Sequence, residues 1–168
     1  MKKLVIFLAI IITILSLNKE EKVTIPKEAI RFRIIGNSNN ELDQDLKREI
    51  VQNLSKELVL SDNITIDEAR KLIKDSIPKY EESINKTLEK NNIKEDFTIN
   101  YGINHFPKKE FKGIEYEEGD YESLVISLGE AKGNNFWCVL FPPICMVDDN
   151  NKDIEYKSFI KEVINKYL

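Results

Sequence analysis

The pattern of apolar and polar positions begins with one long apolar run near the N-terminus. Behind a Met-Lys-Lys start, residues 4–17 form 14 consecutive positions without a charge, and the chain then turns polar. As a helix this run would span about 21 Å, shorter than the ~30 Å hydrocarbon core of a bilayer. The pattern predicts a signal peptide or short membrane anchor over residues 1–17, a polar tether over 18–28 and a folded domain over 29–168, outside the cytoplasm.

Two amphipathic helices are predicted in the first half of the domain. Asn40 is suited to cap the first, and Thr65 with Glu68 three positions later forms a capping box for the second. The apolar stripe of the first helix consists of Leu42, Leu46, Ile50, Leu54 and Leu58. That of the second consists of Ala69, Leu72, Ile73, Ile77, Tyr80, Ile84 and Leu88. Pro78 lies inside the second stripe and is expected to kink or split that helix.

Runs of β-favouring residues predict the strands. They cover residues 29–35, 96–105, about 110–114, 121–128 and 136–141. The last run is apolar on both faces, which is typical of a strand buried on both sides or of an edge strand that meets a partner. A final helix is predicted from about residue 155 to residue 168. The order of elements predicts a single α+β domain, in which a mainly antiparallel sheet packs against helices.

Charge and motif content narrow the functional classes. The chain has 25 Lys and Arg against 29 Asp and Glu, a net charge of −4, which argues against a nucleic-acid surface. Residues 149–153 resemble the start of a calcium loop, but the glycine and glutamate that complete such a loop are absent. We therefore predict no metal and no cofactor.

The chain has one histidine and two cysteines. A hydrolase, which is the alternative function, would pair His105 with Cys138, with Cys145 or with a serine. The ordinary interpretation is a solvent-facing histidine at a strand end. In an exported chain the two cysteines predict one disulfide, Cys138–Cys145, and two buried free thiols are the alternative.

Two stretches of the sequence carry a resemblance to a known family. The first reads R-F-R-I-I-G-N-S over residues 31–38 and continues as D-Q-D-L-K over 43–47. The second extends over residues 121–145 and includes Y-E-S-L, L-G-E-A-K-G and W-C-V-L-F-P-P-I-C. Both are similar to the stage II sporulation protein R family. This sequence departs mildly from the family pattern, with Gly36 where alanine is more usual and Phe136 where a second tryptophan is common.

The resemblance implies a signalling role. Members of the family are made in the forespore and exported into the space between the two sporulation membranes. There they activate a membrane-embedded aspartic protease that processes the precursor of the early mother-cell sigma factor. The resemblance thus implies an activator rather than an enzyme, with that protease as the partner.

The residues expected to contact the partner lie in the second stretch, because aromatic anchors in rigid loops are typical of interface hot spots. They are Gly129, Lys132, Gly133, Asn134, Asn135 and Trp137. For Trp137, burial in the core is the alternative. Arg31, Arg33 and Asn37 form a second predicted contact region. The face of Arg31 and Arg33 is interpreted either as solvated or as a carboxylate-binding patch.

Overall fold

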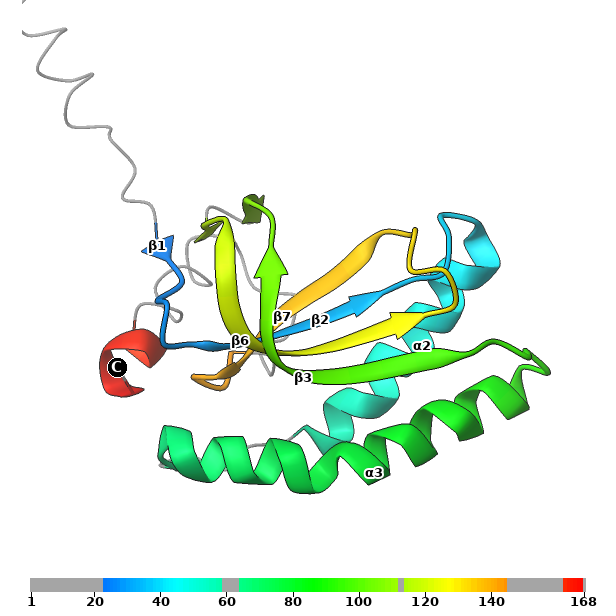
Figure 1. The fold of residues 1–168 in the computed structure, drawn as a ribbon, viewed down its shortest axis with the longest axis horizontal. Coiled ribbons are helices and arrows are strands. Elements are labelled where there is room, and N and C mark those ends of the chain that lie inside the picture. Colours follow the sequence, from blue (N-terminus) through cyan, green and yellow to red (C-terminus); the bar gives the residue numbers. More distant parts are fainter. Residues whose placement is uncertain (1–22, 59–63, 112–113, 145–161, 168) are drawn as a thin grey trace, which may run out of the picture.

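The computed structural model describes residues 23–58, 64–111, 114–144 and 162–167 (Figure 1). The predicted leader over residues 1–17 lies outside this part of the chain, as do Cys145 and most of the predicted last helix, of which residues 162–167 are helical. Within the described ranges, no helix is long and apolar enough to cross a membrane.

Two helices and seven strands are assigned bounds. They are β1 Val23–Thr24, β2 Ile30–Ile35, α2 Glu41–Glu57, α3 Ile66–Lys90, β3 Phe97–Phe106, β4 Lys109–Phe111, β5 Ile114–Tyr116, β6 Gly119–Leu128 and β7 Asn135–Phe141. The expected strands and the two expected helices are all present, so the α+β prediction is confirmed.

The main sheet has four strands in the order β3-β6-β2-β7. The outer pairs, β3 with β6 and β2 with β7, are antiparallel, whereas the central pair β2 and β6 is parallel. Helices α2 and α3 cover one face of this sheet (Figure 1). The larger apolar cluster is made of residues from the two helices and from the strands that they cover. A second, three-stranded sheet has the order β1-β5-β4.

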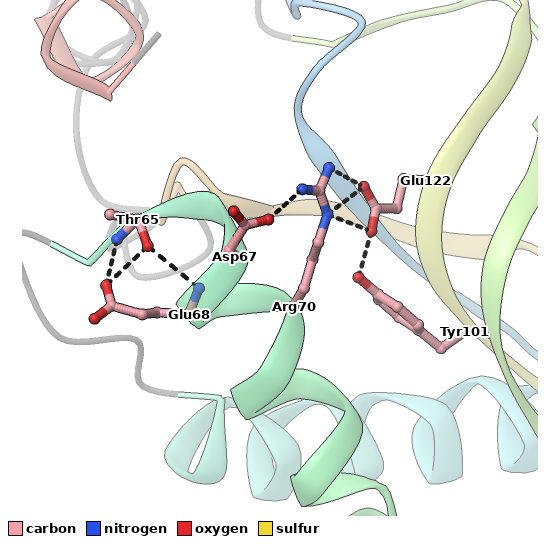
Figure 2. A network of polar contacts seen from close by, with 6 residues as sticks. All are labelled: Thr65, Asp67, Glu68, Arg70, Tyr101 and Glu122. Atoms are coloured by element: carbon pink, nitrogen blue, oxygen red, sulfur yellow. Dashed lines mark hydrogen bonds and ion pairs between the residues drawn. The ribbon is translucent and has the colours of Figure 1, made fainter.

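Both helices begin where their capping residues predict. The side chain of Asn40 accepts a hydrogen bond from the backbone N–H of Asp43 at 2.7 Å. Thr65 and Glu68 form a complete capping box (Figure 2). Such caps satisfy backbone N–H groups that have no partner inside the helix.

The predicted stripe of α2 is wrong at Leu42, which is 77% exposed, although Leu46, Ile50 and Leu54 are buried. A spacing of four residues drifts by about 40° per step around a helix of 3.6 residues per turn, so the first position rotates away from the sheet. In the second stripe, Leu72 is similarly exposed at 44%.

Of the two effects expected at Pro78, a kink or a split, the split is wrong. Helix α3 continues through Pro78, and Figure 1 shows it bowed rather than broken. Pro78 is exposed. Water can therefore reach the backbone carbonyl that the missing proline N–H leaves without a partner.

The predicted polar tether over residues 18–28 is wrong from Val23 onward. Val23 and Ile25 are buried, and β1 pairs with β5. These side chains belong to a second apolar cluster, made of Val23, Ile25, Ala29, Ile114, Tyr116, Val139 and Ile144. The alternation of Val23, Thr24 and Ile25 was the sequence signal of a short strand.

A polar network joins the first turn of α3 to the sheet (Figure 2). The guanidinium of Arg70 donates to both carboxylate oxygens of Glu122 at 2.9–3.1 Å and to Asp67 at 2.7 Å. The hydroxyl of Tyr101 donates to Glu122 at 2.6 Å. These donors, Arg70 above all, lower the pKa of Glu122 against the opposing effect of burial.

We expect Glu122→Gln to destabilise the protein by about 1–3 kcal/mol at neutral pH, because Arg70 then loses the less exposed of its two carboxylate partners. The depressed folded pKa of Glu122 contributes stability that is present above about pH 4.3 and is lost as the pH falls through the folded value. The variant should therefore lose part of the acid dependence of its melting temperature, measured by circular dichroism.

Glu82→Gln is the matched control, because the Glu82 carboxylate forms an exposed ion pair with Lys86. Its melting curve should follow that of the wild type. Equal acid dependence in the wild type and in Glu122→Gln would contradict the stabilising role of the network.

Candidate functional site

Two loops that are far apart in the sequence lie side by side at one end of the main sheet. We call residues 36–40 and 129–134 the paired loops. The first follows β2 and the second connects β6 to β7, the two strands that flank β2. Because β6 runs parallel to β2, both strands end at the same edge of the sheet. The strand order thus brings together the two stretches that carry the family resemblance.

Backbone hydrogen bonds connect the paired loops directly. The N–H of Lys132 donates to the carbonyl of Asn37 at 2.9 Å, and that of Gly133 donates to the carbonyl of Gly36 at 2.8 Å. The side chain of Asn37 accepts from the N–H of Glu130 at 2.9 Å. Asn37 is half-buried, and these hydrogen bonds to its side chain and carbonyl hold the second loop in place.

Two side chains in the N-terminal part of α2 donate hydrogen bonds to backbone carbonyls of the paired loops. The amide of Gln44 donates to the carbonyl of Ser38 at 2.7 Å. The ammonium of Lys47 donates to the carbonyl of Asn134 at 2.8 Å and to the side-chain oxygen of Gln44 at 2.6 Å. Lys47 is buried, and desolvation lowers its pKa.

Lys47 is not among the contact residues predicted from the sequence. It lies three residues before Ile50 and seven before Leu54, which places it on the buried face of the helix. This spacing relative to the apolar residues was the sequence signal that Lys47 is buried.

Two glycines of the paired loops are required by geometry. Gly129 has a φ of +51°, a backbone conformation that side chains disfavour. A Cβ at Gly133 would lie 2.3 Å from the carbonyl oxygen of Ser38 and 2.8 Å from that of Gly36. The close approach of the two backbones therefore depends on Gly133 having no side chain.

Gly129, Lys132 and Asn134 are the exposed members of the predicted contact residues, and of these Lys132 and Asn134 carry polar side chains. The ammonium of Lys132 pairs with the neighbouring Glu130 carboxylate at 2.8 Å. The backbone N–H of Asn134 donates to the side chain of Asn39 at 2.7 Å, which leaves the Asn134 side chain at the surface of a fixed backbone. These two side chains are available to a partner without rearrangement of the loops.

Arg31 and Arg33 point to the opposite face of the sheet from the helices, into a cluster of rings. We call this group the arginine–aromatic cluster, and it consists of Arg31, Arg33, Phe106, Lys109, Tyr116, Tyr121 and Trp137. Arg31 has no exposed surface. Its guanidinium carbon lies 3.3 Å from the ring centre of Tyr121.

The expectations of a solvated face and of a surface contact are both wrong for Arg31. The alternation of Ile30, Arg31 and Phe32 indicated a face exposed to water, but Tyr116 of the second sheet and Tyr121 cover the guanidinium. Burial lowers the pKa of Arg31 from its ordinary value.

Arg33 and Trp137 form a cross-strand pair between β2 and β7 and are both half-buried. The guanidinium carbon of Arg33 lies 5.7 Å from the Trp137 ring centre. When its amide oxygen faces Arg33, Asn135 accepts from Nη2 at 3.0 Å and from Nε at 3.3 Å, and its amide nitrogen donates to the carbonyl of Gly133. Asn135 therefore connects the cluster to the paired loops.

Trp137 belongs partly to the core. Its indole ring meets Phe106 edge-on at 5.1 Å and Tyr116 at 5.6 Å between ring centres, and it packs against the second apolar cluster. The rest of the side chain is accessible, so both interpretations of Trp137 hold for different parts of it.

The structure does not bring His105 to Cys138. These residues lie on β3 and β7, the two edge strands of the main sheet, which are about 14 Å apart across two intervening strands. In the described part of the chain, the polar contacts of His105 are with the carboxylates of Asp120 and Glu118, at 3.1 and 3.9 Å. Cys145 lies outside the described residues, so the Cys138–Cys145 disulfide stays a prediction.

The acidic residues near β6 do not form a metal centre. Over the ranges that the structure describes, no group of three or more His, Cys, Asp or Glu side chains is placed to hold a metal ion. Glu122 is instead paired with Arg70, and Glu115 with Lys108.

The fold and the paired loops define a single-domain α+β protein whose two most distinctive sequence stretches form one surface. The family model of stage II sporulation protein R matches residues 26–151. Stage II sporulation protein R of Bacillus subtilis (strain 168) is 36% identical over 157 residues, covering 90% of this chain and 70% of that protein. No solved structure matches the chain significantly. The chain belongs to the stage II sporulation protein R family.

Gly133→Ala should separate the paired loops, because the added methyl group meets backbone oxygens that cannot move independently. We expect a loss of about 1–3 kcal/mol in the free energy of unfolding, measured by urea denaturation. The resonances of residues 36–40 should shift together with those of residues 129–134.

Gly36→Ala is the matched control. A Cβ there meets the amide nitrogen of Gln44 at 2.8 Å, the end of a flexible side chain, and its next contacts are at 3.5 Å or more. Gly36→Ala should lower the free energy of unfolding much less than Gly133→Ala does. A Gly133→Ala protein as stable as the wild type would show that the loops are not held in contact.

Proposed function

We propose that this protein is an exported sporulation signal that activates a membrane-embedded aspartic protease by docking to its extracytoplasmic face. In this proposal the activated protease processes the precursor of the early mother-cell sigma factor. Family membership supports the sporulation role. The partner is the one that the family resemblance implies.

One observation carries the docking mechanism. The two stretches that resemble the family are about 90 residues apart in the chain, yet they meet in the paired loops through five hydrogen bonds between residues 36–39 and 130–134. A surface held by backbone bonds loses little conformational entropy on binding, which favours its use as an interface.

The proposed interface has an exposed part and a half-buried part. Lys132 and Asn134 are exposed on the second loop, whereas Arg33 and Trp137 lie beside it, joined to it by Asn135. Tryptophan and arginine are the residues most often found at the energetic centres of interfaces. Lys132 and Asn134 are suited to the rim and to partner selection.

We propose a ligand rather than a catalyst, because the fold places Cys138, one of the candidate partners of His105, at the opposite edge of the sheet, and the described polar contacts of His105 are with Asp120 and Glu118. The proposed location is the space between the two sporulation membranes, reached through the leader over residues 1–17. In that location a Cys138–Cys145 disulfide would be maintained.

We expect the double variant Lys132→Glu/Asn134→Asp to keep the wild-type melting temperature and to fail to trigger processing of the precursor. Both side chains are exposed, so the change alters the charge of the surface without altering its backbone support. The assay is coexpression of the chain with the protease and the precursor, with cleavage scored on a gel.

Lys79→Glu/Asn85→Asp is the matched control, since it makes the same change of charge at exposed positions on α3. It should support normal processing. Normal processing by the loop variant would move the interface away from the paired loops, and failure of the wild type to trigger cleavage would refute the proposed function itself.

A further inference from the structure

The arginine–aromatic cluster holds cations that the described structure does not neutralise. Nε and Nη2 of Arg31 are buried and have no hydrogen-bond partner, and Nη1 lies 3.5 Å from the carbonyl oxygen of Glu117. The carboxylate of Glu117 attracts Arg31 only at longer range. The indole Nε1 of Trp137, in the same cluster, is likewise buried without a partner.

The other cations of the cluster add to this imbalance. Lys109 lies with its ammonium 4.9 Å from the Trp137 ring centre, and both burial and the charge of Arg33 lower its pKa. Burial also lowers the pKa of Arg33. Among the described residues, no salt bridge joins a carboxylate to Arg31, Arg33 or Lys109.

Arg70, an arginine with a structural role, provides a comparison within the same chain. Its side chain is 38% exposed, yet it is paired with two carboxylates and donates to Glu122 through two of its nitrogens. Arg31 is less exposed and has no carboxylate partner. Aromatic faces offset only part of the free-energy cost of burying a cation that has no carboxylate partner.

The donors that lack acceptors have a common chemistry. A guanidinium presents planar N–H groups that match the two oxygens of a carboxylate, and an indole N–H can add a further donor. Arg33, Lys109 and Trp137 are half-buried and give the cluster its contact with solvent. Local positive charge here contrasts with the net charge of −4 of the whole chain.

We propose that the arginine–aromatic cluster is a carboxylate-binding site that receives an Asp or Glu side chain of the protein partner. This inference rests on the proposed function for the source of the carboxylate, but not for the chemistry of the site. Arg33 and Lys109, the half-buried cations of the cluster, contact the carboxylate, and the positive charge of the buried Arg31 behind them adds to the attraction. Asn135, which bonds both Arg33 and the carbonyl of Gly133, connects this site to the paired loops.

The chemistry is tested on the purified chain with acetate as the probe. Trp137 is the only tryptophan, so its indole N–H gives a single, assigned resonance in ¹⁵N spectra. Acetate should shift this resonance saturably, whereas sodium chloride at equal ionic strength should not. Arg33→Gln should weaken the response about tenfold or more, the factor expected for the loss of one charged hydrogen bond.

Arg48→Gln is the matched control, because it removes the same charge from the exposed face of α2. It should leave the acetate response unchanged. Arg33→Lys, which keeps the charge and removes the planar fork, should weaken the response as well, and circular dichroism confirms that each variant is folded. An acetate response equal to that of chloride in the wild type would overturn the carboxylate site.

The source of the carboxylate is tested separately in the processing assay. Arg33→Gln should reduce precursor cleavage while Arg48→Gln does not. Normal cleavage by an Arg33→Gln protein that has lost its acetate response would overturn the partner as the source and assign the site to a free small carboxylate. Absence of cleavage with the wild type would refute the proposed function while leaving the acetate result intact.

Discussion

The position of β2 between β6 and β7 is the constraint on which the rest of the structure depends. Ile30, Phe32 and Ile34 pack on one side against the helices, and Arg31 and Arg33 lie on the other side among aromatic rings. Because β2 pairs with both neighbours, the loop that follows it meets the loop that precedes β7. One six-residue strand thus sets the core, the cation cluster and the paired loops.

Local elements could be predicted from the sequence because their determinants are local. The caps at Asn40 and Thr65 depend on neighbouring residues, and the structure confirms them. The last strand, β7, lies at an edge of the sheet, and only its last three residues are buried, so full burial on both sides is not what the structure shows. The parallel pairing of β2 with β6 was not predicted, since it joins residues about 90 positions apart. The helix stripe failed at Leu42 because a four-residue spacing was extended over too many turns.

The candidate site was predictable in part for the same reason. Lys132 and Asn134 are exposed as a polar loop predicts, but alternation along β2 could not show that the second sheet covers Arg31. Lys109 enters the cluster from β4, and no local pattern places it beside Trp137. Residues from separate strands become one site only through the order of strands in the sheet.

The central claim is that β2 holds the paired loops together as one rigid surface, and amide hydrogen exchange followed by NMR tests it most directly. The account predicts the slowest exchange in β2 and β6 and clear protection of the amides of Glu130, Lys132 and Gly133, which donate across the paired loops. Unprotected exchange at these three amides, in a protein whose β2 amides stay protected, would contradict the account.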